Sequence, residues 1–151
     1  MFPARLIVAG RIGNHLQLNS KKRLLEVLGF LLGSDVPELS PEIVFDRLCA
    51  RERLGSTALG QGVALPHARM QEITTAMGAF VQLREGVAFD AIDNRPVDLA
   101  FALLVPESAN ETHLQLISQL ATMFSNPQLI QDLRTAASAE QILALLERPE
   151  A

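Results

Sequence analysis

Residues that could do chemistry are concentrated in the segment 51–69, RERLGSTALGQGVALPHAR, whose apolar run ends at His67. Pro66 fixes its own φ and pushes Leu65 into an extended conformation, so the backbone before the histidine is stiff. Small Ala68 leaves room beside the ring. The pattern predicts an imidazole that is presented for chemistry rather than packed away, although it also fits an ordinary buried turn.

Three glycines, Gly55, Gly60 and Gly62, precede this histidine and are weak evidence for a phosphate cradle. The run lacks the Gly-Lys-Ser/Thr ending of a P-loop and the spacing of a dinucleotide fingerprint. HExxH, paired CxxC and GxSxG motifs are missing from the sequence, which gives no support to zincin, zinc-ribbon or α/β-hydrolase interpretations. The histidines show no ligand-type spacing either, so we expect no metal site.

A second histidine, His113, follows a possible helix start. Ser108 and Glu111 have the spacing of a capping box, which would put His113 within the first two turns. Free backbone N–H groups and the positive end of the helix dipole attract phosphate there. Taken alone, a surface histidine is the simpler interpretation. The third histidine, His15, lies in a predicted loop or strand start and is assigned no role.

Composition limits the class of protein. The formal net charge of −4 and the lack of Trp and Tyr argue against nucleic-acid binding, which uses a basic surface and stacking aromatics. The single cysteine, Cys49, excludes an internal disulfide framework and suits a reducing cytoplasm. No apolar run is long enough for a secretion signal or a membrane span, so we expect a cytoplasmic protein without membrane insertion.

Periodicity and capping signals predict the elements that would position these residues. Helices are expected after Ser20, from Pro41 to about Arg53 behind the N-cap Ser40, after Ser108, near 128–134 and after Ser138. Strands are expected at 76–83 and at 97–105, the latter apolar enough to be a central strand covered on both faces. We therefore expect residues 1–151 to form a single three-layer α/β (α+β) domain, with a mixed sheet of about five strands and helices on both faces.

The chain resembles the mannitol/fructose-type enzyme IIA domains of the bacterial phosphoenolpyruvate phosphotransferase system, and most of all their nitrogen-regulatory branch. The resemblance extends over about 16–146 and rests on several motifs: Arg51-Glu52-Arg53, Gly55-Ser56-Thr57, Gly60, Gly62, Ala64, Pro66-His67-Ala68, Ser20-Lys21-Lys22-Arg23, 89–99, 101–106 and Thr112-His113-Leu114. The chain departs from the family pattern at 1–14, which does not look like the usual leader.

The resemblance implies a phosphocarrier that accepts a phosphoryl group on His67 from an HPr-type donor protein of the nitrogen branch. It implies Arg51 and His113 as the other active-site residues, with Ser56 and Thr57 as weaker phosphate contacts whose alternative is turn chemistry beside Gly55. No metal, nucleotide or other cofactor is implied, because phosphohistidine is already an activated donor. The regulated target proteins are not indicated.

Other functions remain open from the sequence. A sugar-specific enzyme IIA that passes phosphate to a fructose or mannitol permease would use the same residues. A non-catalytic interaction module is disfavoured by the presence of Arg51, His67 and His113 together. A metal hydrolase is the remaining enzyme alternative.

Overall fold

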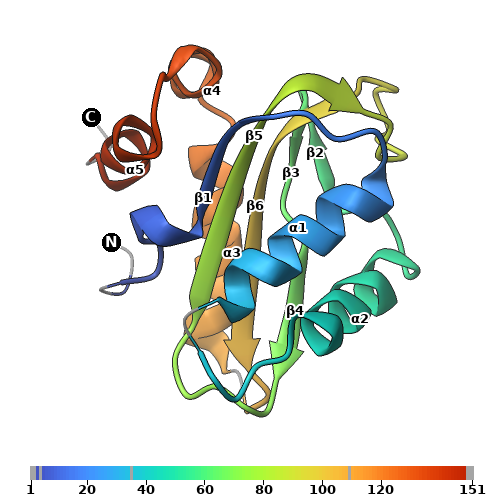
Figure 1. The fold of residues 1–151 in the computed structure, drawn as a ribbon, viewed down its shortest axis with the longest axis vertical. Helices are drawn as coiled ribbons and strands as arrows, with labels where there is room; N and C mark the ends of the chain where they lie inside the picture. The colour runs from blue at the N-terminus through green and yellow to red at the C-terminus, as the bar shows by residue number, and fades with distance from the viewer. Residues whose placement is uncertain (1–2, 4, 35, 109, 149–151) are drawn as a thin grey trace.

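The computed structural model describes residues 3, 5–34, 36–108 and 110–148. In chain order its elements are a 3-10 turn (Ala9–Arg11), β1 (Ile12–Leu16), α1 (Lys21–Gly33), α2 (Pro41–Glu52), β2 (Ala58–Gly60), β3 (Val63–Ala64), β4 (His67–Met70), β5 (Met77–Val87), β6 (Val97–Pro106), α3 (Glu111–Met123), α4 (Pro127–Thr135) and α5 (Ala139–Glu147) (Figure 1). The expected α/β architecture, a mixed sheet with helices on both faces, is confirmed.

Within the described residues the sheet has six strands, whereas about five were expected. Its order is β1-β5-β6-β3-β2, and β4 also pairs with β6. Strands β5 and β6 are antiparallel, whereas β3 and β4 both run parallel to β6 and follow each other along it. The register pairs Ala64 with Ala100 and His67 with Leu103. The Pro66 carbonyl between the two short strands accepts a hydrogen bond from the Leu103 N–H (2.9 Å).

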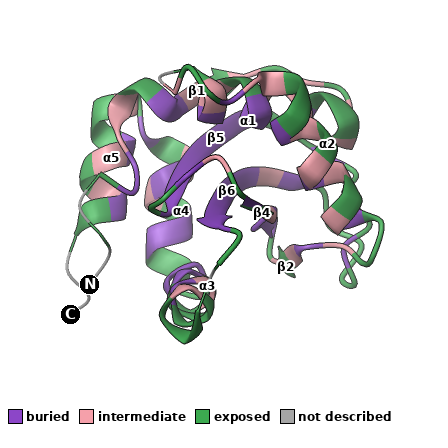
Figure 2. Cartoon of the chain, turned by 90° about the horizontal axis from the view of Figure 1, so that it is seen from below, coloured by how far each residue is buried: buried purple, intermediate pink, exposed green. Residues whose placement is uncertain are grey.

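Strand β6 is the predicted central strand, and its side chains alternate between two cores. Leu99, Phe101, Leu103 and Val105 belong to the core beneath α3, α4 and α5. The smaller Ala100 and Ala102 belong, with Leu104, to the core beneath α1 and α2. Figure 2 shows the buried sheet between these helices. An apolar run without polar alternation therefore indicated a strand buried on both faces.

Most predicted helix starts are confirmed by their caps. The side chains of Ser20, Ser40 and Ser138 each accept a hydrogen bond from the backbone N–H three residues later. Helix α4 begins at Pro127 behind the N-cap Asn126, one residue before its predicted start. Strand β5 is longer than the predicted 76–83, because its exposed polar end at 84–86 continues the strand.

The predicted start of the helix after β6 is wrong by two residues. Asn110 is the N-cap of α3, and Ser108 lies in the preceding turn. The Asn110 side chain accepts from the N–H groups of Thr112 and His113 (3.0 and 3.4 Å). Asn is as good a cap as Ser, and the reciprocal partner here is His113 rather than the Glu or Gln of the usual capping box. The shift places His113 in the first turn.

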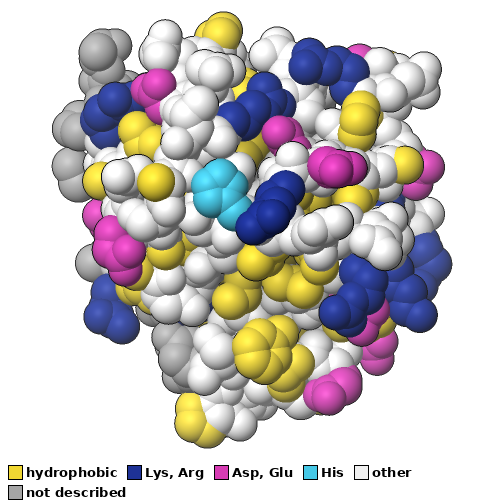
Figure 3. Space-filling view, turned by 45° about the horizontal axis from the view of Figure 1, so that its top comes forward, with side chains coloured by type: hydrophobic (Ala, Val, Ile, Leu, Met, Phe, Trp, Pro, Cys, Tyr) yellow, Lys and Arg dark blue, Asp and Glu magenta, His cyan; other side chains and the backbone are white. Residues whose placement is uncertain are grey.

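The surface carries charges of both signs. On the face drawn in Figure 3, basic and acidic side chains are interspersed with hydrophobic ones. Within the part of the chain that the structure describes, no helix is both long and apolar enough to cross a membrane.

Candidate functional site

The ring of His67 is held by the backbone directly before it. His67 begins β4, and its Nδ1 lies 2.9 Å from the Leu65 carbonyl oxygen. A carbonyl oxygen only accepts, so Nδ1 carries the proton and donates it. In the neutral ring, Nε2 therefore keeps its lone pair. This is the atom that could act as a nucleophile.

The surroundings of His67 keep its ring neutral near pH 7. Burial lowers the pKa of His67 below its ordinary value, and the Arg51 guanidinium lowers it further. The hydrogen bond to Leu65 and the Glu52 carboxylate act in the opposite direction, but the net pKa shift is downward. A half-buried imidazole of this kind is available as a nucleophile without a separate base.

His67, Arg51 and His113 line one hollow of about 380 Å³, between the end of α2, strand β4 and the start of α3. The remaining lining residues are Arg47, Ala50, Leu54, Ala68, Arg69, Val105, Leu114 and Ile117. Among the described residues that line the hollow, three are arginines, two are histidines and none is acidic. The hollow is therefore suited to an anion.

Arg51 lies in the last turn of α2, and its guanidinium is held from the loop that follows. Its Nη1 donates to the Gly55 carbonyl oxygen (2.9 Å). A guanidinium has further N–H donors in a planar fork, and this fork matches the geometry of phosphate oxygens.

The His113 ring has the opposite tautomer to the His67 ring. Its Nδ1 accepts a hydrogen bond from the backbone N–H of Asn110 (3.3 Å), which completes the cap of α3. When neutral, His113 therefore carries its proton on Nε2. The pocket thus combines one unprotonated imidazole nitrogen, on His67, with one N–H donor, on His113.

Ser56 and Thr57 are not among the lining residues of the hollow. The Ser56 hydroxyl donates to the Phe89 carbonyl (2.7 Å) and accepts from the Ala58 N–H (3.2 Å). The Thr57 hydroxyl is buried and donates to the Glu52 carboxylate. Both hydroxyls hold the chain in place, in agreement with the alternative of turn chemistry.

The sequence analysis did not select Arg47, Arg69 or the exposed rim residues Leu54 and Leu114 (84% and 55% exposed). Two of these could have been found from periodicity. Arg47 precedes Arg51 by one helical turn, and Arg69 lies on the same face of β4 as His67. Nη1 of Arg47 also donates to the Arg69 carbonyl (3.1 Å), which joins α2 to β4 beside the hollow.

Of the described residues that line the hollow, only His67 and His113 could ligate a metal ion. In the described ranges of the chain, no group of three or more His, Cys, Asp and Glu residues is placed to hold a metal ion. His15 lies on β1 and does not line the hollow. The arrangement favours nucleophilic attack by an imidazole on an anionic group that the arginines stabilise.

Comparisons of the sequence and of the structure with known proteins agree on one family. Residues 6–148 match the family described as "Phosphoenolpyruvate-dependent sugar phosphotransferase system, EIIA 2". The "Nitrogen regulatory protein" of Escherichia coli K12 is 43% identical over 132 residues, covering 87% of this chain and 80% of that protein. A fructose-specific EIIA component from Haloferax volcanii is 32% identical over 105 residues, covering 70% and 68%.

A solved structure agrees with these relatives. The nitrogen regulatory protein IIA-Ntr from Neisseria meningitidis superimposes with a TM-score of 0.87 at 46% identity, covering 93% of this chain and 96% of that one. Nitrogen-regulatory proteins and sugar-specific components are thus both among the relatives.

Proposed function

The chain belongs to the EIIA type 2 family of the phosphoenolpyruvate-dependent sugar phosphotransferase system, and we propose that it is a phosphohistidine carrier with a nitrogen-type regulatory role. The phosphoryl group comes from an HPr-type donor protein and is accepted on His67. The observation that carries this proposal is the hollow lined by His67, Arg51 and His113, in which Nε2 of His67 keeps its lone pair.

The transfer needs no proton to move. The lone pair of His67 Nε2 forms the new N–P bond, while the N–P bond of the donor phosphohistidine breaks and its electron pair returns to the donor ring. Nδ1 of His67 keeps its proton, and the positive charge gained by the phosphorylated ring is stabilised by the Leu65 carbonyl (2.9 Å). The donor ring, protonated on its other nitrogen, leaves as neutral imidazole.

The phosphoryl oxygens are stabilised by groups already in place. Phosphoryl transfer is mainly positioning and stabilisation of charge on these oxygens. The Arg51 guanidinium and the Nε2–H of His113 supply donors, and the first turn of α3 adds its positive dipole end. Ser56 and Thr57 are not part of this contact set, because their hydroxyls are already bonded elsewhere.

Regulation follows from the change of charge. A phosphoryl group adds close to two negative charges to the surface around His67. Beside that surface, Leu54 and Leu114 expose apolar side chains. A target protein that packs on the uncharged ring and these leucines would be released on phosphorylation.

A sugar-specific role is the second candidate, and the fructose-specific relative from Haloferax volcanii favours it. The two roles differ in where the phosphate goes next. A sugar component passes its phosphate to a permease domain, whereas a regulator keeps it until a target binds or the group is returned to the donor. Incubation of the phosphorylated protein with fructose and mannitol EIIB domains distinguishes them, and we expect no transfer.

The main test is labelling with phosphoenolpyruvate, enzyme I and the HPr-type donor. We expect one acid-labile phosphate per chain, lost completely in His67→Ala. The matched control is His15→Asn, which removes an exposed histidine on β1 where the backbone has φ 54°, a conformation that Asn tolerates. This control should label fully. Label that persists in His67→Ala would refute the assignment.

A further inference from the structure

Glu52 is a buried carboxylate that the transfer chemistry itself does not use. It is the last residue of α2, and its side chain is only 5% exposed. Its Oε1 accepts from the Thr57 N–H (3.2 Å) and lies 3.1 Å from Lys21 Nζ, while its Oε2 accepts from the Thr57 hydroxyl. A buried carboxylate is costly unless it is paired and hydrogen-bonded, and this one is both.

Lys21 forms an ion pair with Glu52 from another helix, α1. It is the first residue of α1, and its Nζ lies over the Phe89 ring (4.4 Å to the centroid) and 3.3 Å from Asp90. The ammonium group is thus fixed by an aromatic face and two carboxylates. The position of the Glu52 carboxylate is set by α1 as well as by its own helix.

A continuous series of hydrogen bonds leads from Glu52 to His67. The carboxylate binds the N–H and the hydroxyl of Thr57, and the Thr57 carbonyl accepts from the Leu65 N–H (3.0 Å). The Leu65 carbonyl then accepts from His67 Nδ1 (2.9 Å). Glu52 therefore anchors the peptide segment that selects the tautomer and direction of the imidazole.

The same carboxylate closes the loop that holds Arg51. The loop 53–57 follows Glu52 and folds back onto it. The Gly55 N–H donates to the Glu52 carbonyl (3.1 Å), and the N–H and hydroxyl of Thr57 donate to the Glu52 carboxylate. The Gly55 carbonyl is the acceptor for Arg51 Nη1 (2.9 Å). The Glu52 carboxylate thus stabilises both the segment that binds the His67 ring and the loop that binds the Arg51 guanidinium.

We infer that Glu52, fixed by Lys21, is a positioning residue for phosphoryl transfer: through Thr57 it holds both the His67 ring and the Arg51 guanidinium in their reactive geometry. The inference rests on the proposed function. It goes beyond packing, because the Glu52 carboxylate also acts on the ring through space and raises the pKa of His67 against the larger lowering by burial. Its negative charge favours the positive charge that the His67 ring gains on phosphorylation.

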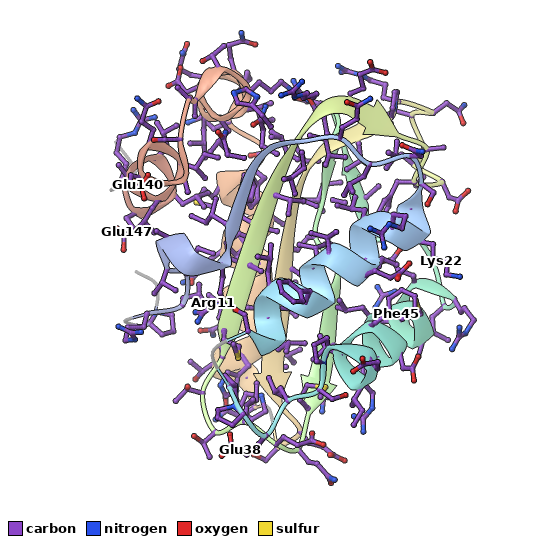
Figure 4. All side chains as sticks on the ribbon, viewed as in Figure 1. Arg11, Lys22, Glu38, Phe45, Glu140 and Glu147 are labelled. Atoms are coloured by element: carbon purple, nitrogen blue, oxygen red, sulfur yellow. The ribbon has the colours of Figure 1, made fainter. Side chains whose placement is uncertain are left out.

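The closing experiment compares Glu52→Gln with Glu147→Gln. The first substitution keeps the shape of the side chain and removes its charge, and the second neutralises an exposed glutamate on α5, away from α2 (Figure 4). Purified phosphorylated donor is mixed with each variant, and the rate of transfer is measured over a range of donor concentrations. We expect Glu52→Gln to lower the rate at saturating donor about 10- to 100-fold with little change in KM, as displaced reacting groups do.

A second pair of variants separates positioning from folding. Thr57→Val removes the hydroxyl but keeps the shape, and Thr57→Ser keeps the hydroxyl. We expect Thr57→Val to transfer slowly and Thr57→Ser to recover most of the rate. If both have the same rate as the wild type while remaining folded, the hydrogen bond to Glu52 has no role in transfer and the inference is overturned.

The ¹⁵N chemical shifts of the His67 ring give a readout that needs no transfer. In the wild type we expect Nδ1 protonated and Nε2 unprotonated, and in Glu52→Gln a mixture of tautomers and a lower pKa of His67, because a nearby anion is lost. Unchanged tautomer and pKa overturn the inference. If the wild type accepts no phosphate but the tautomer still depends on Glu52, the proposed function fails and the positioning of His67 by Glu52 stands.

Discussion

Two networks of ion pairs and hydrogen bonds hold the segment from β2 to β3 in place. The hydrogen bonds of one network continue to the candidate site, and those of the other do not. Before β2, Glu52 binds Thr57 and Lys21. At the turn between β2 and β3, Arg134 of α4 binds both Asp98 oxygens (2.8 and 2.9 Å) and donates to the Gln61 carbonyl (2.6 Å).

The comparison teaches that similar bonds can have different consequences. Arg134 and Asp98 are each about one quarter exposed, and their side chains join α4 and β6 to the turn at Gln61. Glu52 is buried, and its bonds continue through Thr57 and Leu65 to His67. We therefore expect variants near Glu52 to change transfer, and variants near Arg134 to change stability alone.

The largest effect is expected for Arg51→Ala. It removes the guanidinium from the hollow, and loss of one preorganised donor to a developing oxyanion costs about 100-fold or more in rate. Transfer from purified phosphorylated donor, followed by gel or mass spectrometry, measures it. Arg53→Ala is the matched control, because Arg53 is an exposed arginine two residues further along, at the end of α2, and it is not among the residues that line the hollow. Equal rates for the two variants would remove Arg51 from the site.

A smaller effect is expected for His113→Gln. Glutamine at this position can still complete the cap of α3, since Gln is a usual partner in a capping box. The variant loses the imidazole N–H that faces the phosphoryl group, and one hydrogen bond to a charged group is worth about 1.5 kcal/mol, or roughly 10-fold in rate. Single-turnover transfer kinetics measure the loss, and a wild-type rate in a folded variant would show that His113 does not contact the group.

Arg134→Met tests the other side of the comparison. It leaves Asp98 and the Gln61 carbonyl without their donor, and we expect the free energy of unfolding to fall by about 1–3 kcal/mol. Urea denaturation measures this fall. We expect the transfer rate to stay within about 2-fold of the wild-type rate, because the activation free energy of transfer should change by much less than the roughly 1.4 kcal/mol that corresponds to a 10-fold change. A large loss of transfer at full stability would contradict the distinction between the two networks.

The smallest effect concerns pH. Because the pKa of His67 is lowered in the folded protein, the unfolded chain binds a proton more readily as the pH falls through the ordinary range of histidine. The contribution of this residue to stability is therefore complete above that range and lost below it. Urea denaturation at pH 7.5 and 5.5 should show a larger drop for the wild type than for His67→Gln, and equal drops would mean that the ring is not held neutral.

Prediction from the sequence succeeded where the signal was local. The N-cap residues Ser20 and Ser40 predicted the starts of α1 and α2, and the apolar run of β6 predicted burial on both faces. The three-residue strand β2 was not predicted, because it is stabilised by pairing with β3 rather than by its own composition. The start of α3 was misplaced because the N-cap Asn110 donates its reciprocal bond to a histidine rather than to the Glu or Gln of the usual capping box.

In the candidate site, too, residues with a local sequence signal could be predicted and residues without one could not. His67 stood out by its own neighbours and His113 by its place near a predicted helix start, whereas Arg51 followed from the resemblance alone. Glu52 could not be recognised, since a glutamate at the end of a helix is usually exposed. Its burial depends on Lys21, which is remote in sequence and near in space.

The most direct measurement is NMR of the phosphorylated protein with ¹⁵N-labelled histidine. Coupling between phosphorus and a ring nitrogen identifies the atom that carries the phosphoryl group. We expect the coupling on Nε2 of His67, with Nδ1 still protonated and bonded to the Leu65 carbonyl. Coupling to Nδ1, or to a nitrogen of another histidine, would contradict the account.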